Sequence, residues 1–275
     1  MSAAPMTEGV SARFLELHQG DAPLLIPNPW DAGSARVLAW LGFDALATTS
    51  SGFAATLGRA DGSVSRDEAL RHAASVVDAV EIPVSADLEN GFADDPGAVA
   101  DLVLAATDVG LAGCSIEDFT GVTVAPIYEP GLAVERIAAA AAAAHSGPRH
   151  IVLTARCENY LHGRVDLADT ISRLQAFQEA GADVLYAPGL TSAADIRAVV
   201  ESVDRPINVV LMPDGPSVAE LKEIGVRRIS VGGSFAWAAM AGLVEAAREL
   251  RESGTTEFFA AVASGRAAVG AAFAD

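Results

Sequence analysis

The chain has 275 residues, with 18 lysines and arginines against 36 aspartates and glutamates, which gives a formal net charge of −18 at pH 7. A chain this acidic repels phosphate backbones and anionic lipid, so its composition argues against nucleic acids and membrane surfaces as partners. Lys222 is its single lysine and it has two cysteines, which excludes a disulfide framework and leaves one residue for any lysine-dependent chemistry.

Short apolar runs alternate along the chain with longer amphipathic stretches, which predicts alternating strands and helices. The predicted strands are residues 24–28, 45–50, 83–87, 113–117, 151–156, 184–187, 207–212 and 228–231. The predicted helices are residues 32–41, 65–80, 96–109, 133–145, 167–180, 192–203, 217–224 and 235–252. The strands are continuously apolar, which is typical of a parallel sheet buried on both faces.

Local signals mark the ends of several predicted helices. Ser65 precedes Glu68 with the spacing of a capping box, and Asp95 followed by Pro96 opens a further helix. A glycine follows four of the helices and is expected to end each one. These glycines are Gly42, Gly110, Gly181 and Gly225.

The pattern predicts one α/β domain over residues 1–275. We expect a (β/α)8 TIM barrel at about residues 24–252, followed by an extra C-terminal helix within residues 256–273. An open doubly wound sheet is the alternative, and it is disfavoured because no G-x-G-x-x-G motif follows the first strand. In a barrel of this kind the chemistry lies at the carboxyl ends of the strands, so the residues there are the candidates for a site.

Carboxylates stand at the ends of three predicted strands. Asp61 follows the second strand, Asp87 and Glu89 end the third, and Glu117 ends the fourth. Residues two apart on a strand point the same way, so Asp87 and Glu89 share a face if the strand continues that far. Converging carboxylates repel each other unless a cation lies among them, and hard oxygen ligands favour Mg²⁺ or Mn²⁺. We therefore predict a metal site of Asp87, Glu89 and Glu117, with catalytic roles for Asp61 and Glu117.

Arg156 lies at the end of an apolar strand, where an unpaired guanidinium is costly. It is interpreted either as a structural ion pair with Glu117 or Glu158, or as a catalytic and substrate-binding clamp on a carboxylate or phosphonate. The two interpretations are compatible, and the clamp is favoured. Taken singly, Asp118 and Glu158 are interpreted as helix caps or solvated loop charges.

Other residues near the strand ends are candidates for substrate binding. The turn Ser50-Ser51-Gly52-Phe53 follows the second strand and is expected to offer backbone N–H groups to an anion. Asn208, in the seventh strand, is expected to shape the substrate pocket. Glycine-rich loops after the last two strands keep a phosphosugar enzyme open as a competing hypothesis, although no lysine stands at a strand end.

Three side chains are weak candidates for proton transfer. His162 and Tyr160 follow the fifth strand, and Tyr128 lies in the segment after the fourth strand. Anchoring of a loop by an aromatic ring is an equally good interpretation of either tyrosine. These residues stay open as acid–base groups.

Four segments in order resemble the isocitrate lyase / phosphoenolpyruvate mutase superfamily. They read PNPWDAGSARVLAWLGFDALATTSSG, IPVSADLENGF, GLAGCSIED and TARCENY, and the likeness runs over about residues 24–239. The resemblance implies a (β/α)8 barrel that binds Mg²⁺ and cleaves or forms C–C or C–P bonds next to a 2-oxo or 2-hydroxy carboxylate. It also implies a homotetramer, a dimer of dimers in which paired subunits exchange the last barrel helix.

The resemblance assigns roles to particular residues. Asp61, Asp87 and Glu117 match the acids of the family's metal site, and Arg156 matches its substrate arginine. The turn at residues 51–53 matches the segment that holds the substrate carboxylate. Here the site differs from the family, because the D-x-D motif of the third strand reads Ser-Ala-Asp and so lacks one carboxylate.

Other departures narrow the function. The lyases' K-K-C-G-H loop is absent, because residues 119–131 contain no cysteine, lysine or histidine, and the mutases' K-T-N-S loop is absent as well. Ala187 stands where the phosphonate enzymes keep a histidine. We therefore expect a divergent member of the superfamily, an Mg²⁺- or Mn²⁺-dependent lyase-type enzyme that cleaves a C–C bond in a small 2-oxo or 2-hydroxy (di)carboxylate. The alternatives are an enzyme that acts on a C–P bond and a non-catalytic barrel that binds an oxo acid.

The sequence also bears on location. Residues 1–10 lack the basic start and the apolar stretch of a signal peptide, and no stretch is long and apolar enough for a membrane helix. We expect a cytoplasmic homo-oligomer whose partner is a small carboxylate substrate.

Overall fold

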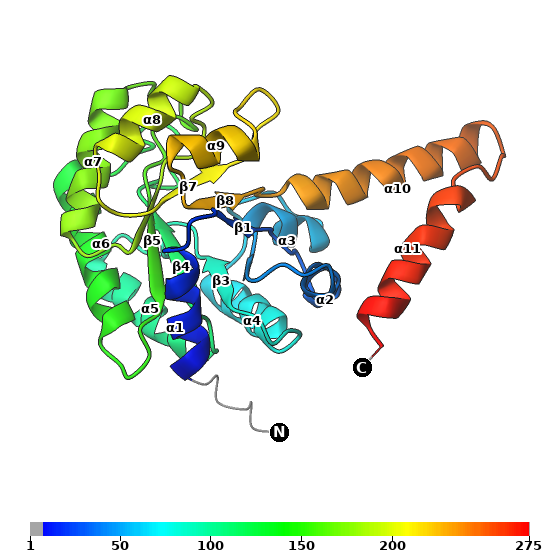
Figure 1. Cartoon of the computed structure of the whole chain (residues 1–275), viewed down its shortest axis with the longest axis horizontal. Helices are drawn as coiled ribbons and strands as arrows, with labels where there is room; N and C mark the ends of the chain where they lie inside the picture. Colours follow the sequence, from blue (N-terminus) through cyan, green and yellow to red (C-terminus); the bar gives the residue numbers. More distant parts are fainter. Residues whose placement is uncertain (1–7, 275) are drawn as a thin grey trace.

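A computed structural model describes residues 8–274, and in this range the chain forms eight parallel strands and eleven helices (Figure 1). The strands are β1 (Leu24–Ile26), β2 (Leu46–Ala47), β3 (Val84–Asp87), β4 (Gly113–Glu117), β5 (Val152–Arg156), β6 (Val184–Tyr186), β7 (Ile207–Val210) and β8 (Arg228–Ser230). The helices are α1 (Glu8–Leu17), α2 (Ala32–Trp40), α3 (Ser50–Thr56), α4 (Arg66–Val77), α5 (Pro96–Asp108), α6 (Pro130–His145), α7 (Leu167–Glu179), α8 (Ala193–Glu201), α9 (Val218–Ile224), α10 (Ser234–Glu252) and α11 (Phe259–Ala272).

The strands form a nearly closed barrel. Each strand from β2 to β7 pairs in parallel with the next along the chain, and β8 pairs with β1. The remaining gap, between β1 and β2, is bridged where the Ala47 N–H donates to the Pro27 carbonyl at 3.1 Å. The predicted TIM barrel is therefore confirmed, and all strands direct their carboxyl ends to the same mouth.

The local signals in the sequence act as predicted. Ser65 and Glu68 form a reciprocal capping box at the start of α4, and Asp95 caps α5 through the Ala98 N–H. The four helix-ending glycines adopt φ values from 89° to 105°, in the left-handed region that glycine enters without steric cost. They are Gly42, Gly110, Gly181 and Gly225.

Two helices were not expected from the sequence. The predicted second strand stops at Ala47, and the presumed turn at residues 51–53 lies inside α3. The cause is Thr49, whose side chain accepts a hydrogen bond from the Gly52 N–H and so begins a helix. The prediction of a turn there was therefore wrong.

The other unexpected helix, α1, closes the amino-terminal end of the barrel. Phe14 is fully buried there in a cluster with residues of β1, β2, β5 and β6. Gly113 makes room for it, because a Cβ atom at that position would lie 2.7 Å from the Phe14 ring. The barrel is thus plugged at one end and open at the other.

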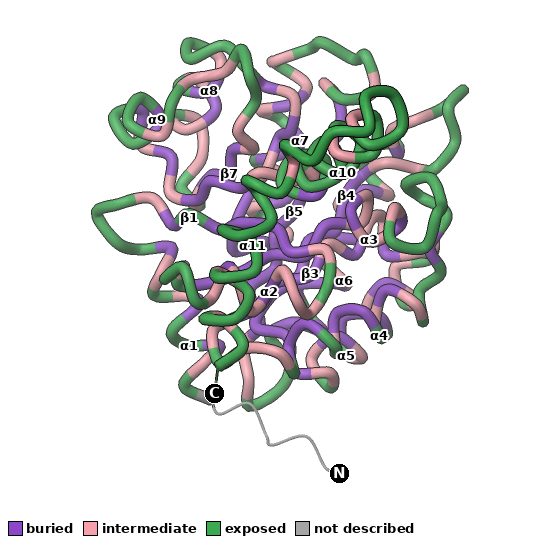
Figure 2. The backbone as a smooth tube through the Cα atoms, turned by 90° about the vertical axis from the view of Figure 1, so that its right-hand side faces the viewer, coloured by how far each residue is buried: buried purple, intermediate pink, exposed green. Residues whose placement is uncertain are grey.

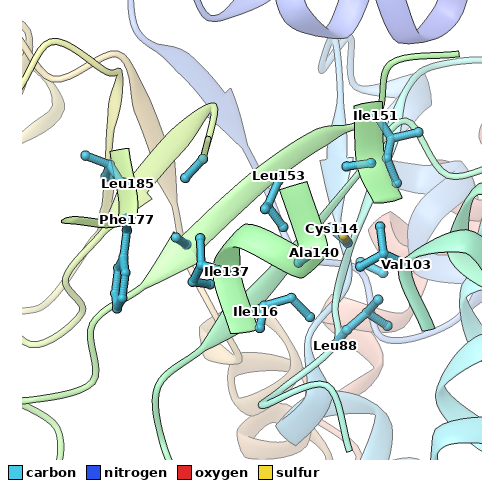
Figure 3. Close-up of a cluster of buried hydrophobic side chains, with 14 of the residues drawn as sticks. Leu88, Val103, Cys114, Ile116, Ile137, Ala140, Ile151, Leu153, Phe177 and Leu185 are labelled. Atoms are coloured by element: carbon cyan, nitrogen blue, oxygen red, sulfur yellow. The ribbon is translucent and has the colours of Figure 1, made fainter. Parts of the chain in front are cut away.

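Between the strands and the helices lies the main apolar core. Figure 3 shows Cys114 of β4 in this core with Val103 of α5, Ala140 of α6 and Leu153 of β5. Burial raises the pKa of the Cys114 thiol to about 12, so it is protonated and unreactive at neutral pH.

The C-terminal helices stand apart from the barrel. Helix α10 leads away from it, and α11 folds back beside α2, where Arg36 lies 5.0 Å from the ring of Phe273 (Figure 1). Figure 2 shows both helices as mostly exposed; of their described residues, Ala236 alone is buried. Helix α11 is the extra C-terminal helix that was predicted. Across residues 8–274, every helix is either too short or too polar to cross a membrane.

Candidate active site

A cavity of about 280 Å³ opens at the carboxyl ends of the strands. It brings together five of the residues predicted from the sequence, although these lie far apart along the chain. They are Ser51, Asp61, Asp87, Arg156 and Asn208. Glu89 and Glu117 line a second cavity of about 740 Å³, and Asp61 lines both cavities. The predicted acids therefore face two adjoining hollows at the same end of the barrel.

Arg156 is the electrostatic centre of this mouth. Its Nη1 lies 2.8 Å from the Asp87 carboxylate, and its Nη2 lies 3.0 Å from Glu117. Both Nε and Nη2 reach the Glu158 carboxylate, at 3.0 and 2.9 Å. The ion pairs considered from the sequence are present, and Asp87 adds another. We call Arg156 with Asp87, Glu117 and Glu158 the Arg156 cluster.

Glu158 and its neighbour Asp118 are not solvated loop charges. Glu158 is 2% exposed and pairs with Arg156, while Asp118 is 1% exposed and lies 3.2 Å from Nη1 of Arg173. Asp118 also accepts the Glu158 N–H at 2.8 Å. The interpretation of these two acids was wrong because burial between β4, β5 and α7 depends on the closed barrel.

Hydrogen bonds with residues that follow β2 and with a residue of β4 fix Asp87. The Ser50 hydroxyl donates to Oδ2 at 3.0 Å and the Ser115 hydroxyl to Oδ1 at 3.4 Å. The Asp87 N–H in turn donates to the Thr48 hydroxyl at 3.0 Å. Asp87 is thus positioned by residues that follow β2 and by β4, and Ser50, which the sequence placed in the candidate anion-binding turn, holds Asp87 instead.

Glu89 does not continue the strand. β3 ends at Asp87, and Glu89 has a φ of 49°, in the left-handed region that residues with a side chain seldom adopt. The condition for Asp87 and Glu89 to share a strand face is therefore not met. Burial, together with the charges of Asp87 and Asp61, raises the pKa of the Glu89 carboxyl to about 7.

The donor set suits a hard divalent cation. Asp61, Asp87, Glu89 and Glu117 supply carboxylate oxygens, which Mg²⁺ and Mn²⁺ prefer. Burial and the neighbouring acids hold the pKa of Glu117 well above its usual value, although Arg156 opposes the shift. Arg156 thus does not fully compensate the crowded acids of the mouth, and a divalent cation fits these residues.

Gly52 and Phe53 lie outside both cavities. The Phe53 ring faces the outside of the barrel and stacks on His72 with centroids 3.9 Å apart. Gly52 is buried, and a Cβ atom there would lie 2.6 Å from Thr49. Of the predicted substrate-binding segment, Ser51 alone among described residues presents its side chain to the cavity at the barrel mouth.

The candidates for proton transfer have other contacts. The Tyr128 hydroxyl donates to Asp94, and Tyr128 also lies under the guanidinium of Arg136. The His162 ring stacks on Phe119 with centroids 3.9 Å apart. These contacts anchor the segments that surround the mouth.

A separate group of metal-ligand type lies at the other end of the barrel. Among residues 8–274, His145, His150 and Asp183 are the group of three or more histidine, cysteine or acidic residues whose ligand atoms all lie within 4.8 Å of one another. The Asp183 carboxylate lies 3.0 Å from His145 and 3.1 Å from His150, and it accepts the Leu153 N–H at 2.9 Å. These residues adjoin the amino-terminal ends of β5 and β6, away from the cavity.

Comparison with known proteins identifies the family. The family described as phosphoenolpyruvate phosphomutase matches residues 14–251. A candidate lyase/mutase from Burkholderia cenocepacia is 51% identical, covers 96% of both chains and superimposes with a TM-score of 0.93. Oxaloacetate acetylhydrolase in complex with its product oxalate is 26% identical over 92% of this chain and 90% of its own, with a TM-score of 0.82. The 2-methylisocitrate lyase of Halalkalibacterium halodurans is 28% identical over 71% of this chain and 65% of that protein. The chain therefore belongs to the phosphoenolpyruvate phosphomutase family, within the isocitrate lyase / phosphoenolpyruvate mutase superfamily.

Proposed function

We propose that this chain is a Mg²⁺- or Mn²⁺-dependent lyase-type enzyme that cleaves a C–C bond in a small 2-oxo or 2-hydroxy dicarboxylate. The observation that carries the proposal is the Arg156 cluster, which places a guanidinium among carboxylates at the mouth of a small cavity. The similarity to a 2-methylisocitrate lyase and to an oxaloacetate acetylhydrolase supports a carboxylate substrate.

Asp87, Glu89 and Glu117 are the residues proposed to hold the cation, with Asp61 in support. A divalent cation in such a site stabilises negative charge that develops on a substrate oxygen during bond cleavage. The Ser50 and Ser115 hydroxyls keep the Asp87 carboxylate in place before any ligand arrives. Less reorganisation is then needed when substrate binds.

Arg156 and Ser51 are the proposed substrate-binding residues. An acidic mouth repels an anionic substrate, and the fixed charge of Arg156 lowers the electrostatic cost of bringing a carboxylate into it. The Ser51 side chain lines the same cavity and offers a hydroxyl to the substrate. Both residues line the cavity that Asp87 also lines.

Cleavage of a 2-hydroxy acid needs one base and one acid. The base removes the hydroxyl proton, the C2–C3 bond breaks, and the electron pair left on C3 takes up a proton. Residues 119–129 contain no cysteine, lysine or histidine for these transfers, and the Tyr128 hydroxyl is bonded to Asp94. Asp61 is therefore the proposed base, because it lines both cavities and its carboxylate accepts from the N–H of its neighbour Gly62.

We also propose that the chain assembles into a homo-oligomer through α10 and α11. Large apolar side chains on these helices face solvent in the single chain, as Trp237, Leu243 and Phe259 do at 49%, 62% and 58% exposure. Exposed apolar surface of this extent is typical of a protein–protein interface. Exchange of these helices between subunits would bury it.

Calorimetric titration with oxalate tests the metal and the carboxylate site together. Oxalate has two adjacent carboxylates and cannot undergo the proposed cleavage. Saturable oxalate binding that requires Mg²⁺ or Mn²⁺ and is lost in Asp87→Asn supports the proposal. Oxalate binding of equal strength in EDTA contradicts the metal site.

A further inference from the structure

A second arginine, Arg228 of β8, lies inside the barrel. It is 4% exposed, yet it lines the cavity at the barrel mouth. Its Nη1 donates to the Thr154 hydroxyl at 3.0 Å, and its Nε is buried without a hydrogen-bond partner. Phe14 of the amino-terminal plug lies below it, with the ring centroid 5.9 Å from Cζ.

The two arginines of the cavity differ in their partners. Three carboxylates contact Arg156, whereas among the described residues no carboxylate oxygen lies within 4.0 Å of Arg228. Burial lowers the pKa of Arg228 to about 10, so the guanidinium stays charged at neutral pH. An unpaired buried charge is costly and is rarely retained without a use.

The described residues around Arg228 supply hydrogen-bond donors for a ligand but no negative charge that would pair with the guanidinium. His18 lies below the barrel floor, and burial, aided by the Arg228 charge, lowers its pKa to about 3, which leaves it neutral. Ser230 accepts from the Asn208 amide at 3.1 Å and also interacts with the hydroxyl of Tyr186, a buried residue of the same cavity, so hydroxyl groups surround this part of the cavity. The Thr154 hydroxyl accepts from Arg228 and keeps its own proton for a ligand.

The spacing between the two arginines suits a short molecule with an anion at each end. Thr154 and Arg156 lie two residues apart on β5 and therefore on the same face, about 7 Å apart along the strand. Arg228 contacts Thr154, so its guanidinium lies one layer deeper than the Arg156 cluster. A ligand anchored at the mouth would extend its far end to this deeper layer.

We propose that Arg228, with the hydroxyls of Thr154 and Ser230, forms a subsite that binds the second carboxylate of the substrate and selects dicarboxylates over monocarboxylates. The inference rests on the proposed function, which places the first carboxylate at the mouth. Asn208 Oδ1, buried and without a donor, adds an acceptor beside this subsite. Because Asn208 Oδ1 can accept a hydrogen bond, it favours a substrate with a hydroxyl group over one whose only polar groups are carboxylates.

Two ligands that differ only at the far end test the subsite. Malate and 2-hydroxybutyrate share the 2-hydroxy carboxylate, and the second carboxylate of malate is a methyl group in 2-hydroxybutyrate. Calorimetry in Mg²⁺ should show that the wild type prefers malate. Arg228→Met should weaken malate binding by roughly ten- to a hundredfold, the value of a charged hydrogen bond, and leave 2-hydroxybutyrate within about twofold. Arg228→Lys should recover part of the preference.

A metal-free measurement separates this inference from the proposed function. Succinate in EDTA should raise the melting temperature of the wild type and not that of Arg228→Met. That result supports the subsite even if no metal-dependent binding is found at the mouth. The subsite is overturned if succinate stabilises both proteins equally or stabilises neither. It is also overturned if Arg228→Met keeps the wild-type preference for malate, whatever the enzyme's activity.

The stability of Arg228→Met without ligand shows whether Arg228 has a purely structural role. Because Arg228 has no acidic partner among residues 8–274, Arg228→Met should unfold at the same temperature as the wild type or above it. A large loss of stability in Arg228→Met, with no difference in ligand preference in Arg228→Lys, would show that the guanidinium only supports the fold.

Discussion

The Arg156 guanidinium donates to the Asp87 carboxylate at 2.8 Å and so joins β5 to β3 across the intervening strand β4. Glu117 of β4 lies on the same guanidinium at 3.0 Å. One side chain therefore ties the ends of three strands together and sets the charge of the mouth. Changes at Arg156 should affect both the stability of the barrel and the binding of a cation.

Replacing Arg156 by methionine should destabilise the fold by about 3–5 kcal/mol, because it leaves buried carboxylates without their cation. Urea unfolding with and without Mn²⁺ measures the effect. Mn²⁺ should add more stability to Arg156→Met than to the wild type, because in the variant the metal ion is the positive charge that replaces Arg156 among the acids. Equal metal effects on the two proteins would argue that the acids do not form a cation site.

Asp87→Asn should fold normally and lose divalent-cation binding. The asparagine amide oxygen can replace Oδ1 and accept from Ser115, and its NH2 group can replace Oδ2 and donate to the Ser50 hydroxyl, which also accepts hydrogen bonds; the main change is the lost charge. Calorimetric titration with Mn²⁺ is the measurement. Asp44→Asn is the matched control, because Asp44 forms an exposed pair with Arg13 at 3.0 Å away from the mouth. Identical Mn²⁺ affinity in both variants would remove Asp87 from the metal site.

Neighbouring substitutions in α3 should separate packing from substrate contact. Gly52→Ala places a Cβ atom 2.6 Å from Thr49 and 3.1 Å from Trp30, and overpacking of this kind costs about 1–3 kcal/mol. It should also reduce kcat/KM, because the same helix turn carries Ser50 and Ser51. Phe53→Leu should keep kcat/KM and lose only stability, because its ring stacks on His72. An activity loss in Phe53→Leu as large as in Gly52→Ala contradicts this placement.

His18 should make the fold sensitive to acid. Burial is the main cause that lowers its folded-state pKa from 6.5 to about 3, and the charge of Arg228 adds to the shift. The unfolded chain then binds the proton more readily, so stability falls as the pH drops below about 6.5. The wild type should lose about 2 kcal/mol more than His18→Asn between about pH 7 and pH 5. Parallel pH profiles of the two proteins in urea unfolding would contradict a neutral His18.

A charge placed on α10 should weaken the assembly. Leu243 is 62% exposed in the single chain, and Leu243→Glu should lower the mass seen by size-exclusion chromatography with light scattering. Glu245→Gln on the same exposed helix is the control and should leave the mass unchanged. A monomeric wild type, or an unchanged mass for Leu243→Glu, is evidence against the proposed interface.

Much of the barrel could be predicted because its signals are local. Each strand is a short apolar run, and a glycine after the preceding helix marks several joints. Helix α1 could not be predicted from a local signal. It is held by Phe14, which packs inside the barrel against strands that follow it in the chain, and Gly113 leaves the space for the ring.

The sequence predicted which strand ends gather at the site, but it did not predict which side chains contact each other there. Parallel strands bring their ends to one mouth, which placed Asp61, Asp87 and Arg156 around one cavity. Glu89 leaves the strand direction because its backbone is left-handed, and no residue pattern in the sequence indicates that conformation. Arg228 gave no such signal, because it is the first residue of β8 and follows Arg227, whereas Arg156 is the last residue of β5.

The reaction proposed for this chain is metal-dependent cleavage of a C–C bond in a small dicarboxylate. Proton NMR of the wild-type protein with Mg²⁺ and a panel of 2-oxo and 2-hydroxy dicarboxylates, together with phosphonopyruvate, tests it most directly. We expect that at least one dicarboxylate is converted to two smaller products, and that EDTA and Asp87→Asn both abolish the conversion. Phosphate release from phosphonopyruvate with every dicarboxylate left intact, or no turnover of any compound, would contradict it.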